Sequence, residues 1–262
     1  MSETGDIVKG LNLPKQILDK ATELAKTLFG PAANEVGEMF ADQVRFRRMK
    51  NQVVIFNKTV DLLEKNNLKA RELNTKTLVP LLEQSSLEDE ALLQSKWATL
   101  IANIVSSPES GLEPKLIKTL SGLSTLEAQV LDFAWTLYIE KRQSMFEKSK
   151  ASKWPSYPTI EAIRPDMVGL EFDTVKAKFN LTNEFAIICV ENLVALGLLK
   201  YVDPEVEIED HGSEVEEESD PERRRPFNLR LSVSATYNRS NDFNLTVYGN
   251  YFLDQCNHEP SS

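Results

Sequence analysis

Residues 34–66 read NEVGEMFADQVRFRRMKNQVVIFNKTVDLLEKN. No proline interrupts this stretch, Gly37 is its only glycine, and its apolar residues recur at the spacing of one face of an α-helix. The stretch therefore predicts a single long helix, around which the rest of the chain is expected to pack.

The apolar residues of this helix form two rows. The candidate packing row, spaced seven residues apart, consists of Met39, Phe46, Val53 and Val60. A second row, three residues further on, consists of Met49, Phe56 and Leu63, and Asp42 occupies what would be its first position. The rows are short for a free coiled coil. They favour a central bundle helix that is packed by its own neighbours.

Four basic residues lie close together in the same helix. These candidate interaction residues are Arg45, Arg47, Arg48 and Lys50. Such a cluster can contact phosphate or anionic lipid. A solvated helix face explains it at least as well.

Several separate motifs follow one another along the chain. They are GPAANEVG at 30–37, FRRM at 46–49, LVPLLEQSSLED at 78–89 and WATLIAN at 97–103, with a weaker echo in LTVYGNYFLDQC at 245–256. On these motifs the chain resembles the abortive infection alpha family. The resemblance implies a role in bacterial defence against phage, in which infected cells stop growing or die. It implies no known catalytic residues.

Residues 13–29 predict an amphipathic helix. Its candidate membrane or packing face consists of Ile17, Leu24, Leu28 and Phe29. Three lysines are partly offset by two acidic residues, which leaves little attraction to anionic lipid. Packing on the long helix is therefore expected, and contact with a membrane interface is the alternative.

The predicted fold is mainly α, in two domains. Residues 1–110 are expected to be a helical domain with the amphipathic helix, the long helix and two further helices over 75–84 and about 88–105. Residues 106–111, rich in Ser, Pro and Gly, predict the boundary. In residues 111–262, helices are expected over 114–120, 124–147, 160–168, 172–179, 182–196 and 245–256, with strands over 198–202 and 228–235. This order predicts a winged-helix-like domain with a small β-hairpin. A plain helical domain with a β-ribbon is the alternative.

Residues 204–222 contain ten acidic residues and no lysine or arginine, so the rest of the chain carries no net charge. The segment predicts a disordered, solvated loop. Masking of a basic partner and mimicry of nucleic acid are less favoured alternatives. Residues 183–196, which would form the recognition helix, also lack lysine and arginine. Because DNA binders neutralise phosphates with such cations, the sequence argues against DNA binding by this module.

The residues of common catalytic sites are missing from the sequence. The two histidines, His211 and His258, lie in the acidic segment and near the C-terminus, where an oriented catalytic base is not expected. No zinc-binding cluster of histidines and cysteines and no glycine-rich phosphate loop is present. We therefore expect no catalytic residue, no metal and no cofactor, and we expect Cys189 and Cys256 to be buried thiols.

The sequence predicts a cytosolic protein, since it has neither an apolar run long enough to span a membrane nor a signal peptide. With the resemblance, it predicts a non-enzymatic abortive-infection factor that acts through protein–protein association or self-association. A version acting at the membrane is less favoured. The alternative is a regulator that binds nucleic acid or a defence partner through the basic cluster. An enzyme acting on nucleic acid or nucleotides is a third possibility.

Overall fold

The structure is a computed structural model, which describes residues 23–24, 26–28, 43–153, 155–203, 205–214, 230–238 and 241–260. For residues 43–46, 205–214 and 230–238 it describes the backbone alone. Within these ranges the protein is mainly helical, and two short pairs of antiparallel strands complete it.

The long helix α3 spans Gln43–Lys65. The beginning of the predicted helix, residues 34–42, lies outside the described part, and its end is within one residue of the prediction. The second apolar row is buried, whereas Val53 and Val60 of the candidate packing row are half-buried. Met39 and the side chain of Phe46 lie outside the described residues. The buried face of α3 is therefore centred on the second row and its neighbours Ile55 and Thr59.

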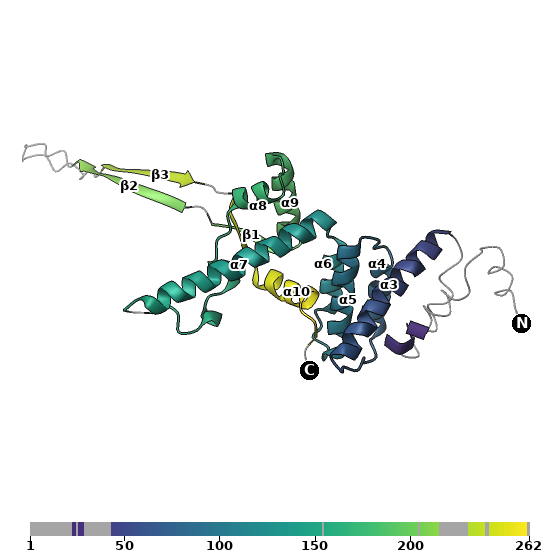
Figure 1. Cartoon of the computed structure of the whole chain (residues 1–262). Coiled ribbons are helices and arrows are strands. Elements are labelled where there is room, and N and C mark those ends of the chain that lie inside the picture. The colour runs from purple at the N-terminus through teal and green to yellow at the C-terminus, as the bar shows by residue number, and fades with distance from the viewer. Residues whose placement is uncertain are drawn as a thin grey trace, which may run out of the picture.

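Three shorter helices pack with α3 into a bundle, as Figure 1 shows. They are α4 (Thr75–Ser85), α5 (Ala91–Ser106) and α6 (Glu113–Ser121), with α5 against α3 and α6 against α4. The Asn74 side chain accepts a hydrogen bond from the Thr77 amide at 2.9 Å, which caps the first turn of α4.

The next helix is α7 (Thr125–Ala151), which extends beyond the predicted end at 147. A capping box between Ser124 and Glu127 fixes its start. Further along, α8 (Phe172–Lys178) and α9 (Asn183–Ala195) agree with the predicted helices. The helix predicted over 160–168 is wrong, because the structure has two short 3₁₀ turns at Ile160–Ala162 and Pro165–Met167. Pro165 explains the break, since a proline disfavours helical geometry in the residue before it.

The strand pairing differs from the predicted hairpin, in which residues 198–202 would pair with residues 228–235. Strand β1 (Leu199–Tyr201) pairs with β4 (Phe243–Leu245), and Leu170 forms a bridge to Phe243. Strand β2 (Glu205–Glu214) pairs with β3 (Arg230–Asn238) in a ribbon that extends away from the helices (Figure 1).

Much of the segment predicted as a disordered loop is therefore a strand. Val206 is paired with Tyr237 and Ile208 with Ala235. Apolar residues at alternate positions favour a strand, and the high acidic content of the segment obscured this pattern in the prediction.

The C-terminal helix α10 (Val247–Asn257) returns the chain to the first half, where it packs against α5 as well as α7. Its first turn contacts the segment before β1 very closely. A Cβ atom on Gly249 would lie 2.1 Å from the Leu198 carbonyl oxygen, which is backbone and cannot rotate away. Thr246 caps the helix by accepting from the Gly249 amide at 2.7 Å and donates to the Gly197 carbonyl at 2.6 Å.

This contact predicts a strong effect of a single methyl group. Gly249→Ala should destabilise the fold by about 3 kcal/mol, the upper part of the range for overpacking, although alanine is ordinarily the better helix former. The matched control is Gly169→Ala, because a Cβ atom there meets nothing within 4 Å. Urea unfolding followed by circular dichroism measures both. Equal stability of the two variants would contradict the close approach of α10.

Candidate functional site

The basic cluster on α3 lies against the C-terminal end of α4. Arg48 donates from Nε to Ser86 Oγ at 2.8 Å and from Nη2 to the Glu83 carbonyl at 3.4 Å. Arg48 is half-buried by these contacts. Its guanidinium group is thus used within the fold.

Two neighbours of Arg48 act in the same way. Asn51 donates to the Ser86 carbonyl at 3.2 Å, and Gln52 donates to the Leu82 carbonyl at 2.9 Å. The last carbonyl groups of a helix have no partner within that helix. These buried amides of α3 bond the end of α4 to α3.

The other candidate interaction residues have different surroundings. The side chain of Arg47 is 77% exposed, and its guanidinium lies 3.5 Å from the Asp89 carboxylate. A pair this exposed contributes at most about 1 kcal/mol. Lys50 is also exposed, and the side chain of Arg45 lies outside the described part. Arg47 and Lys50 are therefore the two members that the structure places within reach of a partner.

The candidate membrane or packing face is described at two positions. Leu28 is buried in the core and Leu24 is half-buried against it. Ile17 and Phe29 lie outside the described residues. The described part of this face thus contacts the protein itself.

A buried polar cluster joins α5, α7 and α10. The Lys96 side chain is only 7% exposed, and its Nζ lies 2.7 Å from Asp132 Oδ1 and 2.5 Å from Asn257 Oδ1. Asn257 in turn donates to Asp132 at 2.8 Å. This cluster was not predicted from the sequence. A signal was available, because Lys96 lies three residues after Leu93 and four before Leu100, on the apolar stripe of its helix.

The free cysteines are both buried, as predicted. Burial raises the pKa of the Cys256 thiol to about 12, the nearby Lys96 charge lowers it and Asp132 raises it. Burial, with a smaller effect of Glu127, raises the pKa of Cys189 to about 11. Because the thiolate is the reactive form, neither thiol is a nucleophile at neutral pH in this structure.

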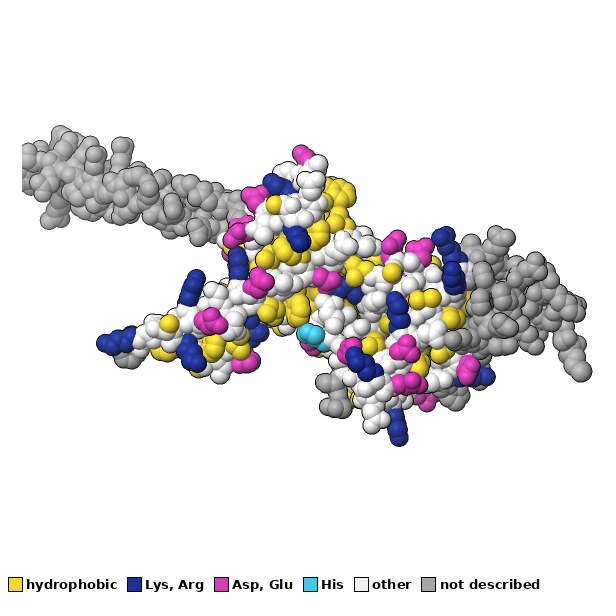
Figure 2. All heavy atoms as spheres, in the orientation of Figure 1, with side chains coloured by type: hydrophobic (Ala, Val, Ile, Leu, Met, Phe, Trp, Pro, Cys, Tyr) yellow, Lys and Arg dark blue, Asp and Glu magenta, His cyan; other side chains and the backbone are white. Residues whose placement is uncertain are grey.

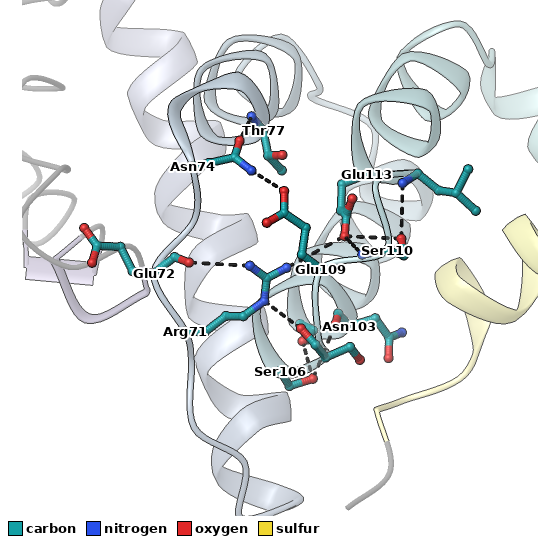
Figure 3. Close-up of polar contacts among 12 residues, drawn as sticks. Arg71, Glu72, Asn74, Thr77, Asn103, Ser106, Glu109, Ser110 and Glu113 are labelled. Atoms are coloured by element: carbon teal, nitrogen blue, oxygen red, sulfur yellow. Dashed lines mark hydrogen bonds and ion pairs between the residues drawn. The ribbon is translucent and has the colours of Figure 1, made fainter.

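A second polar cluster, shown in Figure 3, joins the segment before α4 to the turn between α5 and α6. The backbone amide of Arg71 donates to the Val105 carbonyl at 2.8 Å, and the Nε atom of the Arg71 side chain donates to the Ser107 carbonyl at 2.6 Å. Its Nη2 lies 3.7 Å from Glu113 Oε1. The turn that the sequence marks as a domain boundary is thus attached to the first half by hydrogen bonds, while the boundary itself stays a prediction.

Glu113 is the buried acid of this second cluster. Its Oε1 accepts from the Ser110 amide at 2.7 Å and from the Ser110 hydroxyl at 3.2 Å. Burial raises the pKa of the carboxyl, but these bonds and others from the backbone of Glu113 and Gly111 outweigh burial, so the pKa lies below its usual value. The cluster stabilises a charged carboxylate inside the protein.

Helix α9 presents an exposed apolar surface. Phe185 is 53% exposed and Ile188 is 51% exposed, although other members of the helix, such as Ala186 and Leu193, are buried. Residues three apart lie on the same side of a helix, so the two large side chains are neighbours. The exposed Glu184 and Glu191 accompany them. We call this surface, formed by Glu184, Phe185, Ile188 and Glu191, the α9 face.

Groups suited to catalysis or metal binding are not evident among the described side chains. His258 pairs with Asp254 at 2.6 Å and packs edge-to-face with Trp135, and His211 lies in β2, where the backbone alone is described. Within the described ranges no group of three or more His, Cys, Asp or Glu residues is arranged to hold a metal ion. None of the described helices is both long and apolar enough to cross a membrane.

A comparison with known protein families found a match to abortive infection alpha over residues 41–256, which is most of the chain. The chain belongs to the abortive infection alpha family. A comparison with curated proteins found no match, and neither did one with solved structures.

The family match confirms the resemblance seen in the motifs and places the protein in abortive infection, a defence against phage. The matched range begins just before α3 and ends in α10. The second polar cluster and the α9 face of this abortive infection alpha protein lie inside it, as do Lys96 and Asp132 of the first cluster, whose third member Asn257 follows its last residue.

The first of these clusters predicts an asymmetry between single and double substitution. Lys96→Met should destabilise the protein by about 2 kcal/mol, less than the 3–5 expected for a fully buried pair, because the Asp132 side chain is 33% exposed. Lys96→Met combined with Asp132→Leu should recover most of that loss, since no unpaired charge remains. Chemical denaturation measures the free energy of unfolding of both single variants and of the double variant, with Lys58→Met at an exposed hydrogen bond as control. If the losses of the two single variants simply add in the double variant, Lys96 and Asp132 are not coupled.

The second cluster predicts a pH dependence. Glu113→Gln should cost about 1–2 kcal/mol at pH 7, because bonds to a charged acceptor are lost. A carboxyl whose folded pKa is depressed stabilises the fold above its unfolded pKa of about 4.3 and loses this contribution as the pH falls through the folded value. The difference in free energy of unfolding between wild type and Glu113→Gln should therefore become smaller below about pH 4. Unfolding curves at several pH values measure it, with the exposed Glu140→Gln as control. A gap independent of pH would show that the charge of Glu113 is not what stabilises the turn.

Proposed function

We propose that this abortive infection alpha protein acts in phage defence without catalysis of its own, by binding a protein partner through the α9 face. The single observation that carries the proposal is the exposure of Phe185 and Ile188 side by side on a helix whose opposite side is buried. Aromatic side chains dominate the binding energy of many protein interfaces.

The charges around the α9 face indicate what the partner offers. Glu184 and Glu191 are exposed beside the two apolar side chains, and α9 contains no lysine or arginine. A complementary surface would be apolar at its centre and would have lysine or arginine at its rim. Nucleic acid is a poor fit, because its phosphates would be repelled by these carboxylates.

We further propose that the second half is a winged-helix-like module. Support comes from the order of elements, in which α7, the Leu170 bridge, α8, α9, β1 and β4 follow one another. Strand β4 is bonded to Leu170 on one side and to β1 on the other. In this arrangement α9 occupies the place of the recognition helix. Since fold does not determine function, the α9 side chains rather than the topology argue for a protein partner.

Two other readings have less support. Action at the membrane would require the N-terminal helix to leave the protein, yet Leu28 is buried in the core. A regulator that binds its partner through the basic cluster could not use Arg48, because its guanidinium group is hydrogen-bonded at the end of α4.

The test is a phage challenge of bacteria that express the protein. Wild type should reduce plaque numbers while infected cells die, and Phe185→Ser with Ile188→Ser should remove most of the protection. Hot-spot residues each contribute about 2 kcal/mol or more to binding, which is roughly 30-fold in Kd.

Val247→Ser with Leu87→Ser is the matched control, because both residues are large, apolar and more exposed than those of α9, and both lie on other parts of the molecule. Melting temperatures establish that all variants fold. Full protection by the α9 variant would remove the α9 face from the mechanism. Normal plaque numbers with wild type, across a panel of phages, would count against the defence role itself.

A further inference from the structure

Two elements project from the same end of the molecule in Figure 1. One is the β2–β3 ribbon. The other, which we call the basic arm, consists of residues 139–153 at the end of α7 together with the returning segment 155–164. Isolated two-stranded ribbons are at best marginally stable in water. Contact with a partner would therefore stabilise the ribbon of this protein.

The basic arm is a built structure. Arg142 donates from Nε and Nη2 to the Ile160 carbonyl at 3.1 and 2.8 Å. The buried Ser149 accepts a hydrogen bond from the Tyr157 amide at 3.0 Å. These bonds hold the returning segment against α7.

The end of the basic arm carries three exposed lysines, Lys148, Lys150 and Lys153. None of them forms an ion pair with another described residue, whereas Lys141 at the base of the arm pairs with Glu171 at 3.1 Å. Figure 2 shows dark blue side chains of Lys and Arg along this projection and at its tip, with fewer magenta side chains of Asp and Glu among them. The arm thus presents positive charge that the rest of its own described chain does not neutralise.

The ribbon carries the opposite charge. Strand β2 contains five acidic residues, Glu205, Glu207, Glu209, Asp210 and Glu214, and β3 contains one basic residue, Arg230. At 0.1 M ionic strength, charges within about 10 Å of each other still interact. An acidic ribbon and a basic arm on one chain are therefore complementary.

We propose that the basic arm binds the β2–β3 ribbon of a second copy, so that the protein forms a two-fold dimer. Because both elements project from the same end, one two-fold axis would form both contacts at once, each copy giving its ribbon and receiving the other's. The ribbon would gain the partner that its own helices do not provide. This dimer does not depend on the α9 face.

A charge-swap experiment on the full chain tests the proposal. Wild type should be dimeric by light scattering at low salt, and its dimer should weaken at least about tenfold when the ionic strength is raised toward 1 M. Lys148→Glu, Lys150→Glu and Lys153→Glu together should give a monomer. Glu205→Lys, Glu207→Lys and Glu209→Lys together should also give a monomer. An equimolar mixture of the two variants should again form a dimer. In the mixed dimer the negative arm of one variant meets the positive ribbon of the other, and the remaining arm and ribbon keep their wild-type charges.

Several results would overturn the proposal. They are a monomeric wild type at low salt, a dimer that persists in either charge-reversed variant, and a mixture that does not reassociate although both variants keep the wild-type circular dichroism spectrum. Binding of a short DNA duplex by a monomeric wild type, lost in the lysine variant, would assign the arm to nucleic acid instead. The Phe185→Ser and Ile188→Ser variant should remain dimeric, so that failure of the dimer and failure of the defence proposal can be told apart.

Discussion

Three helices, α5, α7 and α10, meet at the buried ammonium group of Lys96. A buried ammonium group without a partner would cost several kcal/mol. Asp132 from α7 and Asn257 from α10 supply the partners, at 2.7 and 2.5 Å. Asn257 thus bonds the returning C-terminal helix to α5. This return joins the helical bundle to the second half, and it brings Gly249 against the Leu198 carbonyl at the other end of α10.

The same packing determines which surfaces stay free. The buried residues of α9, Ala186, Cys189, Val190 and Leu193, belong to the common core. On its other side Phe185 and Ile188 are exposed among the described residues. Exposed apolar side chains that stand singly are ordinary in soluble proteins, but two neighbours on one rigid helix form a small surface with a defined shape. A rigid helix also loses little entropy when a partner binds it. The α9 face is thus better suited to recognition than a loop of the same composition.

The sequence predicted the elements better than their pairing. Repeating apolar residues located α3, α5, α8, α9 and α10, because local periodicity reports a helix directly. The strand pairing could not be read in the same way, since it depends on contacts between distant residues. The acidic content of residues 205–214 also concealed the alternation of Val206 and Ile208 with glutamates. At the site, charge alone marked Arg48 as an interaction residue, and only the structure shows that it serves the end of α4. The exposure of Phe185 likewise depends on which side of α9 the rest of the chain covers.

The two proposed surfaces differ in what they would contribute to association. Charged projections such as the basic arm and the acidic ribbon attract a partner over distance and raise the rate of encounter, but they are screened by salt. An apolar face with an aromatic residue acts only at contact, and there it supplies much of the affinity. Ten acidic residues lie in residues 204–222, which include strand β2, while the α9 face has two carboxylates and no cation. This uneven distribution of charge favours different roles for the two proposed surfaces. The projections would bring copies of the chain together, and the α9 face would bind a different partner.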